Sequence, residues 1–354
     1  MSSIPEDETL SERETASHGE AEAGGAIAPP LESEALLTEV PLAGSPFPET
    51  DGALADEFEP AQAPDGMLET VPPMFQQFTQ TVARPPARIP NFAHFLLLMV
   101  ILIGGFVGAV LLILLALHFR LYGVTNIQGT ATEIHYTLGS EGLIYLFTLL
   151  GSMAIFPLLW HKSFFAGIQW NAGAAKRQWK WLLGTAFVCF LLALLNSWAL
   201  PGPSHAPIEK IFREPGAAWL LFAFGITAAP FSEEIFFRGF LLPSLCTAYD
   251  WIAEQMYNVP ERPLGENGHP QWSFGAMAAG AVLTSLPFAG MHAAQTGYSL
   301  GPFLLLVGVS IVLCAVRLST RSLASSTLVH ASYNFMLFAI MLVGTGGFRH
   351  LDRM

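Results

Sequence analysis

The chain has 354 residues, of which 12% are charged and 52% are hydrophobic. Soluble globular proteins carry about 25% charged residues, so this composition excludes an ordinary soluble enzyme and indicates an integral membrane protein. The net charge of −12 is concentrated in residues 1–83, which hold 17 acidic residues and one basic residue, Arg13; the rest has 11 acidic and 15 basic residues. Nucleic acid is not an expected partner, because the acidic part repels phosphate and the remaining basic residues are scattered between apolar runs.

The three cysteines, Cys189, Cys246 and Cys314, lie at or inside apolar stretches. They show neither a CxxC motif nor a Cys/His spacing, which argues against a disulfide framework and a structural zinc site. We expect them to be small buried side chains.

The N-terminal residues 1–92 contain 13 of the 25 prolines and show no sustained hydrophobic period. Such a segment cannot bury enough apolar surface to offset its chain entropy, so we expect a disordered, acidic, Pro-rich tail. A basic stretch followed by an apolar core is missing at the N-terminus, so a cleaved signal peptide is not expected.

An apolar run of 23 residues without a charge, residues 95–117, would form a helix of about 34 Å, enough to cross a bilayer. Further apolar runs follow at residues 142–160, 181–200, 217–245, 274–292, 300–316 and 323–343. The sequence therefore predicts an all-α integral membrane protein: a bundle of about seven to eight transmembrane helices with a polar intramembrane site, preceded by the disordered tail. We expect the membrane domain at residues 93–345 and a short C-terminal tail at residues 346–354.

The topology follows from the flanking Lys and Arg residues. With seven spans and the N-terminal tail inside, nine of them lie on the cytoplasmic side and five on the other. This bias favours a cytoplasmic tail. We expect an integral protein of the plasma (inner) membrane. The segment 163–181, with three Trp residues beside Lys176, Arg177 and Lys180, is typical of the headgroup layer.

Two carboxylates and a guanidinium interrupt the fourth apolar run, between Phe231 and Arg238. A charge at the centre of a transmembrane helix costs roughly 2.5–3.5 kcal/mol on insertion scales, so three charges near one depth need a reason. Glu234 and Arg238 are spaced i,i+4 with the acid on the N-terminal side, so they can pair on one helix face. Glu233 points about 100° away and cannot share Arg238 in the same geometry. It is therefore the acid available for chemistry.

Two further polar pairs stand at helical spacing in apolar runs. Phe288 and His292 are i,i+4 near the end of the fifth run, and His330 and Asn334 are i,i+4 in the seventh. Either histidine alone could be a hydrogen-bonded packing residue. Together with Glu233 they supply an acid/base, two imidazoles and an amide from three helices, which is what activating a water and stabilising an oxyanion requires.

These motifs resemble those of the CAAX prenyl endopeptidase and bacteriocin-processing proteases, the CPBP or Abi group of intramembrane proteases. The family motifs EExxxR, FxxxH and HxxxN/D occur here in order as Glu233-Glu234 with Arg238, Phe288 with His292, and His330 with Asn334. The resemblance covers roughly residues 140–345 and its protease-like core is residues 217–340.

The resemblance implies an intramembrane endopeptidase that cleaves a peptide bond of a membrane-associated peptide or protein. Glu233 and His292 would activate water, while His330 and Asn334 would bind the oxyanion or a metal. Glu234, Arg238 and Phe288 would support the site. Both a zinc mechanism, with Glu233, His292 and His330 as ligands, and a metal-free mechanism are open, since catalytic zinc takes three protein ligands plus water.

Two other classes of function remain open from the sequence. A catalytically inactive membrane scaffold of the same fold would keep the motifs without hydrolysis, and a transporter would use the intramembrane charges to line an ion pathway. A Glu233→Gln variant discriminates between hydrolysis and the scaffold. The motifs of zinc, serine and presenilin-type intramembrane proteases are absent from the sequence, and nothing in it identifies a cleavage site.

The seven-span topology conflicts with a shared active site. His292 would lie at the outer end of the fifth run, whereas His330 lies seven residues from the cytoplasmic start of the seventh, so the two would differ in depth. A common site therefore predicts that the region Ser273–Gly301 is shortened, kinked near Pro287 or re-entrant.

Overall fold

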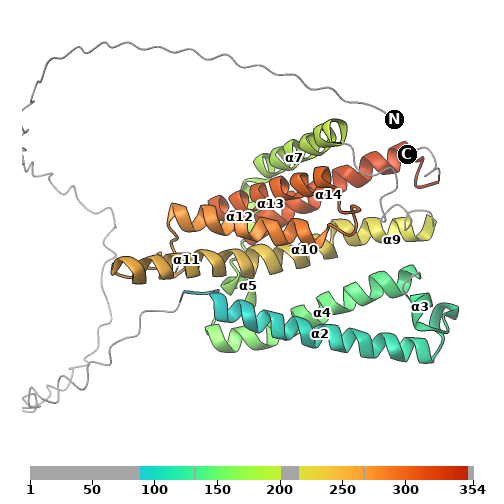
Figure 1. Cartoon of the computed structure of the whole chain (residues 1–354), viewed down its shortest axis with the longest axis horizontal. Helices are drawn as coiled ribbons and strands as arrows, with labels where there is room; N and C mark the ends of the chain where they lie inside the picture. The colour runs from blue at the N-terminus through green and yellow to red at the C-terminus, as the bar shows by residue number, and fades with distance from the viewer. Residues whose placement is uncertain (1–87, 131–132, 201–214, 266–267, 350–354) are drawn as a thin grey trace, which may run out of the picture. The chain divides into compact units, whose positions relative to one another are not determined.

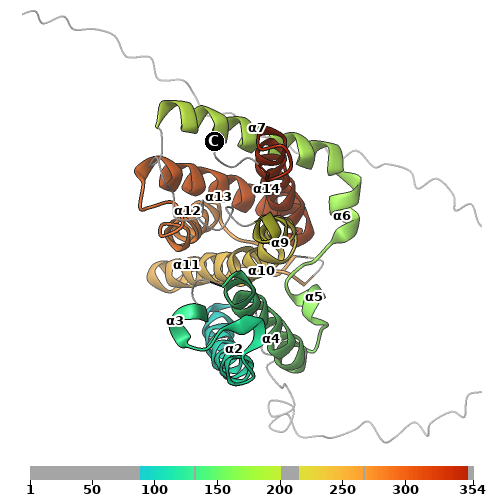
Figure 2. The same cartoon turned by 90° about the vertical axis from the view of Figure 1, so that its right-hand side faces the viewer.

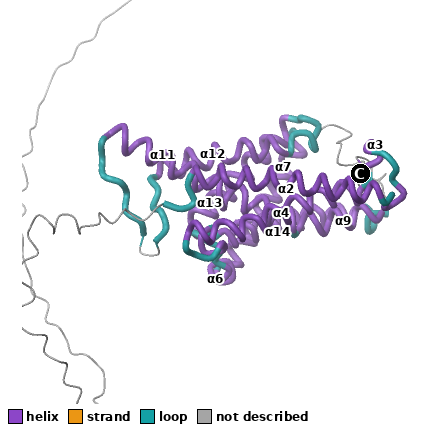
Figure 3. Tube along the Cα trace, turned by 90° about the horizontal axis from the view of Figure 1, so that it is seen from below, coloured by secondary structure: helices purple, strands orange, loops and turns teal. Residues whose placement is uncertain are grey.

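The structure is a computed structural model that describes residues 88–130, 133–200, 215–265 and 268–349. The expected tail lies almost entirely outside these residues. The described part consists of helices and loops without a β-strand (Figure 3). In chain order the helices are α2 (Phe92–His118), η1 (Leu121–Gly123), α3 (Ile127–Thr130), α4 (Ile134–Trp160), α5 (Phe164–Gly167), α6 (Ala172–Arg177), α7 (Trp179–Ala199), α9 (Pro215–Ile226), α10 (Ala228–Glu234), η2 (Ile235–Leu241), α11 (Leu242–Tyr257), α12 (Phe274–Met291), α13 (Leu300–Thr320) and α14 (Leu323–Gly344).

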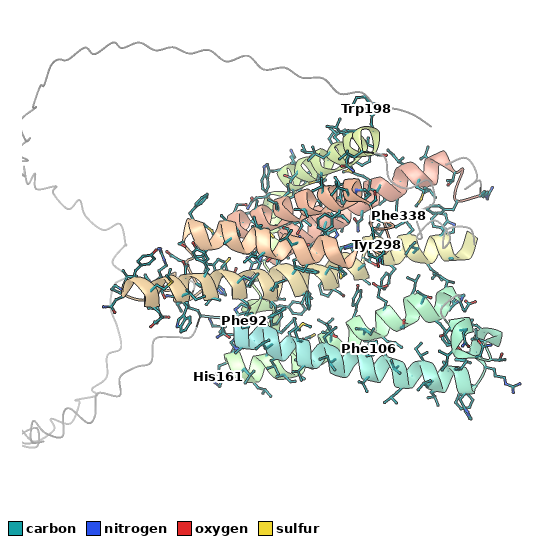
Figure 4. All side chains as sticks on the ribbon, in the orientation of Figure 1. Phe92, Phe106, His161, Trp198, Tyr298 and Phe338 are labelled. Carbon is teal, nitrogen blue, oxygen red and sulfur yellow. The ribbon has the colours of Figure 1, made fainter. Side chains whose placement is uncertain are left out.

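Seven of the described segments are long and apolar enough to cross a membrane. They correspond to the seven apolar runs, with α9 to α11 forming one span of 42 residues, Gly216–Tyr257. Large apolar side chains cover the outside of the bundle: Phe106 and Trp198, labelled in Figure 4, are 55% and 82% exposed. Apolar surface of this extent is suited to lipid, so the prediction of an all-α membrane protein is confirmed.

The long span formed by α9, α10, η2 and α11 lies at the centre of the bundle (Figure 2). The pair α2 and α4 packs on one side of it, while α12, α13 and α14 lie on the other side. Helix α7 covers α13 and α14 from outside. In this arrangement Glu233, Glu234 and Arg238 of the central span lie between the α2–α4 pair and the group formed by α12, α13 and α14.

The hairpin of α11 and α12 extends beyond the ends of the neighbouring helices (Figures 1 and 3). Its connection is tied to the start of α2 by Arg88, whose Nη2 donates to Glu254 Oε1 at 2.8 Å and to the carbonyl of Arg262 at 3.0 Å. At the base of α12, the backbone N–H of Ser273 donates to Asp250 at 2.9 Å. These contacts fix where α12 begins.

The described part of the expected C-terminal tail packs against the bundle. Phe348 is 1% exposed and lies with Ala218 in one apolar cluster, with its ring 5.2 Å from that of Trp219. Residues 346–349 are therefore an integral part of the folded unit at the end of α14, and residues 350–354 lie outside the described residues.

Candidate active site

The central span is broken just before the two glutamates. Pro230 has no N–H to donate four residues back, and its ring disfavours the straight helix there. The helix accordingly breaks at Thr227, with φ −126° and ψ −81°, between α9 and α10. This break turns the next residues, including Glu233, into the interior of the bundle, where its side chain is 11% exposed.

The helix continues as a π-helical segment, η2, directly after Glu234. Such segments are rare and often occur at functional sites. Arg238, inside η2, donates from Nη1 to Glu234 Oε1 at 2.8 Å, and both side chains are completely buried. The pairing expected from the i,i+4 spacing is thus present.

A serine of α13 and an aromatic ring complete the surroundings of Arg238. Its Nη2 donates to Ser310 Oγ at 2.6 Å and to the Ser310 carbonyl at 3.2 Å. The ring centroid of Phe288 lies 4.5 Å from the guanidinium carbon, a cation–π contact. The arginine is therefore fixed by three helices, which also fixes the carboxylate of Glu234.

Glu234 orients the first histidine. The distance between Oε1 of Glu234 and Nδ1 of His330 is 3.1 Å. A carboxylate held by Arg238 accepts hydrogen bonds, so Nδ1 of His330 carries the proton. The other ring nitrogen, Nε2, then faces Oε2 of Glu233 at 3.8 Å.

The second histidine is oriented by a backbone carbonyl. His292 is the C-cap of α12, and its Nδ1 lies 2.8 Å from the carbonyl oxygen of Phe288. A carbonyl only accepts, so Nδ1 donates and Nε2 faces Glu233 Oε1 at 3.9 Å. The carboxylate of Glu233 thus lies between the Nε2 atoms of two histidines from two different helices. Both separations exceed a direct hydrogen bond.

The conflict in depth between His292 and His330 is resolved by a short, displaced helix. Helix α12 has 18 residues, the fewest of the seven candidate spans, and ends one residue before His292. It remains helical through Pro287. Because α12 begins on the extended hairpin, His292 just after its end and His330 in α14 both come close to the Glu233 carboxylate, at 3.9 Å and 3.8 Å. The expected shortening is found, and no re-entrant hairpin occurs among the described residues of this region.

Asn334 has a partner that the sequence does not indicate. Its Nδ2 donates to the carbonyl of Gly225 at 2.8 Å, next to the break in the central span. The ring of Phe338, labelled in Figure 4, leaves no room for a side chain there, since a Cβ on Gly225 would lie 2.8 Å from it. One N–H of Asn334 is therefore used in the fold, and its second N–H and Oδ1 remain for a ligand.

Two cavities meet at Glu233. The larger, about 410 Å³, is lined by all four predicted catalytic residues: Glu233, His292, His330 and Asn334. The smaller, about 190 Å³, lies towards α2 and α4 and is mostly apolar, with Leu98, Leu102 and Phe236 among its lining residues. The site therefore has a polar centre between a larger cavity and a smaller, apolar one.

The three candidate zinc ligands do not fit a zinc ion in this arrangement. Tetrahedral zinc with bonds of 2.0–2.2 Å holds its ligand atoms roughly 3.4 Å apart. Here Glu233 is 3.9 Å from His292 and 3.8 Å from His330. Among the described residues, no group of three or more His, Cys, Asp or Glu side chains is placed to hold a metal.

Three residues near the site carry no recognisable signal in the sequence. Ser310 is a serine in an otherwise apolar run, and Gly225 acts through its carbonyl. Glu141 lines the larger cavity and accepts a hydrogen bond from Tyr145 at 2.8 Å. Glu141 stands one residue before the second apolar run, so the hydropathy pattern does not place it inside a membrane span.

Residues 215–336 match the family model described as type II CAAX prenyl endopeptidase Rce1-like. The matched segment begins with α9 and includes all three motifs. No curated protein and no solved structure matches the chain. The resemblance to the CAAX endopeptidase family is therefore confirmed, and this part of the chain is similar to intramembrane peptidases.

Proposed function

We propose that the chain is an intramembrane endopeptidase that hydrolyses a peptide bond with a water activated by Glu233. The observation that carries this proposal is the position of the Glu233 carboxylate between the Nε2 atoms of His292 and His330, in a cavity inside the bundle. A carboxylate in this position can bind a water and accept its proton as a general base.

In the proposed reaction, the water oxygen attacks the carbonyl carbon of the scissile bond while its proton passes to Glu233. The second N–H of Asn334 donates to the oxyanion. His330, whose Nδ1–H is held by Glu234, lines the same cavity and positions its Nε2 beside the reacting groups. When the C–N bond breaks, the proton on Glu233 passes to the leaving amine, with His292 in position to relay it. The products are a new carboxylate and a new amine.

The two cavities support a substrate that is partly apolar. The smaller cavity beside Glu233 is lined mainly by aliphatic and aromatic side chains and would take a lipid chain or large apolar side chain. The larger would take the polypeptide. A membrane-associated peptide with its scissile bond near the bilayer suits both.

Cleavage assays with the reconstituted full chain test this proposal. The probes are a peptide ending in S-farnesyl cysteine followed by three aliphatic residues, and the same peptide without the farnesyl group, with products identified by mass spectrometry. Wild type should cleave at least one peptide and Glu233→Gln neither. Glu133→Gln is the matched control, because Glu133 lines neither cavity.

Two results would contradict the proposal. If wild type cleaves neither peptide, or Glu233→Gln cleaves as fast as wild type, an inactive scaffold or a transporter explains the site better. We also propose that the reaction needs no zinc, because the ligand atoms are too widely spaced to share one. Activity should then survive 1,10-phenanthroline, and metal analysis of active protein should find less than one zinc per chain.

A further inference from the structure

The larger cavity contains an acidic side chain, Glu141, to which the proposed hydrolysis gives no role. It lies in α4, seven residues after Ile134, and lines the cavity together with Glu233. Ionisable residues inside membrane spans are costly and usually mark a binding site or a pathway. Glu141 therefore needs a functional explanation of its own.

The carboxylate of Glu141 is held in place by a neighbouring tyrosine. Tyr145 donates its hydroxyl hydrogen to Glu141 Oε1 at 2.8 Å, and the Tyr145 ring stacks on Phe224 with centroids 5.8 Å apart. Within the part of the chain that the structure describes, Glu141 forms no ion pair with a basic residue. Its carboxylate thus lines the cavity with a hydrogen bond from Tyr145 and no basic partner among the described residues.

The position of Glu141 along the cavity follows from its neighbours. A Cβ on Gly142 would lie 3.8 Å from the ring of Phe224. The residue after Phe224, Gly225, accepts the hydrogen bond of Asn334. Glu141 is therefore near the level of Asn334, which is about one helical turn, or 5.4 Å, from His330 on α14.

We propose that Glu141 forms a subsite for a basic side chain of the substrate, Lys or Arg, one or two residues from the scissile bond. The inference rests on the proposed function. An extended peptide advances about 3.3 Å per residue, so a displacement of one helical turn corresponds to one or two residues. Apolar lining residues such as Leu221 and Leu337 would cover the aliphatic stem of a lysine, whose ammonium group would reach the carboxylate.

The test uses binding, so that it does not depend on hydrolysis. A series of fluorescent peptides ends in S-farnesyl cysteine followed by three further residues. Each peptide carries one Lys or one Gln at a single position within two residues of the bond after the cysteine, and the cysteine itself is kept. Their Kd values are measured with Glu233→Gln in nanodiscs. At one position the Lys peptide should bind at least tenfold more tightly than the Gln peptide. The additional change Glu141→Gln should abolish this ratio, whereas Glu133→Gln, at the N-cap of the same helix and outside the cavity, should retain it.

Equal affinity for Lys and Gln peptides at every position, or no binding at all, would overturn the subsite. A preference that persists in Glu141→Gln would also overturn it. Should Glu141→Gln fail to fold, Glu141→Asp keeps the charge on a shorter side chain and should reduce the ratio; an unchanged ratio there counts against the proposal. A clear Lys preference in a chain that cleaves no peptide would contradict only the proposed hydrolysis.

Discussion

The Nδ1 atom of His330 lies 3.1 Å from Oε1 of Glu234, the same oxygen that accepts a hydrogen bond from Arg238. The two adjacent glutamates therefore have different environments. Glu234 is completely buried and bonded to a cation and an imidazole, whereas Glu233 makes no direct hydrogen bond with any described residue and faces both cavities. This contrast separates a residue that maintains the site from one that is available for chemistry.

The first prediction compares the two glutamates. Glu233→Gln should abolish cleavage and leave the melting temperature in detergent nearly unchanged, because no hydrogen bond is lost. Glu234→Gln should lower stability by about 3–5 kcal/mol, since it leaves the buried Arg238 without its charge partner. Arg238→Ala should do the same by leaving Glu234 unpaired. Equal losses of stability for both glutamate variants would contradict this division of roles.

A second prediction concerns Ser310, which the motifs do not include. Ser310→Ala removes the Oγ acceptor of a completely buried Arg238 Nη2, so stability should fall by about 1–3 kcal/mol. Cleavage should fall as well, because Arg238 positions Glu234 and through it His330. Ser319→Ala is the control on the same helix, since Ser319 is exposed and bonds only within α13. If the two variants melt at the same temperature, Ser310 has no supporting role.

The sequence predicts those features that depend on one helix. The seven spans follow from long runs without charge, and the Glu234–Arg238 pair follows from i,i+4 spacing. The break at Thr227 and the π-helical segment η2 are not predicted, because they depend on what packs around Pro230 and Arg238. A proline in an apolar run does not by itself specify a helix break, and an arginine there does not by itself specify a π-helical segment.

Contacts between helices limit what could be predicted of the site. The four predicted residues Glu233, His292, His330 and Asn334 line one cavity, as three motifs on three helices suggest. The bond from Asn334 to Gly225 joins residues 109 positions apart, and a backbone carbonyl has no signature in a sequence. The displacement of α12 likewise depends on the length of the α11–α12 hairpin.

The third prediction is a pH dependence at the α11–α12 connection, outside the membrane spans. Burial lowers the pKa of His269 below its usual 6.5. The positive charges of Lys162, Arg317 and Arg321 lower it further. The folded protein therefore binds this proton less readily than the unfolded chain, so stability is present above about pH 6.5 and is lost as the pH falls below it.

Melting temperatures between pH 7.5 and pH 5 check this prediction. The wild type should lose stability as the pH falls, and His269→Gln should lose less, because it has no proton to bind. His161→Gln, at an exposed histidine, should follow the wild type. Parallel pH curves for wild type and His269→Gln would show that His269 is not responsible.

The last prediction concerns Arg88, the first residue that the structure describes. Its side chain is 7% exposed, pairs with Glu254 at 2.8 Å and lies 3.3 Å from Glu261. Deleting residues 1–83 keeps these contacts, so membrane insertion, cleavage and the melting temperature should not change. Arg88→Ala leaves Glu254 with the backbone N–H of Arg262 as its remaining hydrogen-bond donor and should cost about 1–3 kcal/mol. Because this pair fixes the base of the hairpin from which α12 begins, His292 would be less well positioned and cleavage should fall too. A deletion of residues 1–83 that lowers the melting temperature as much as Arg88→Ala would instead show that the tail packs on the bundle.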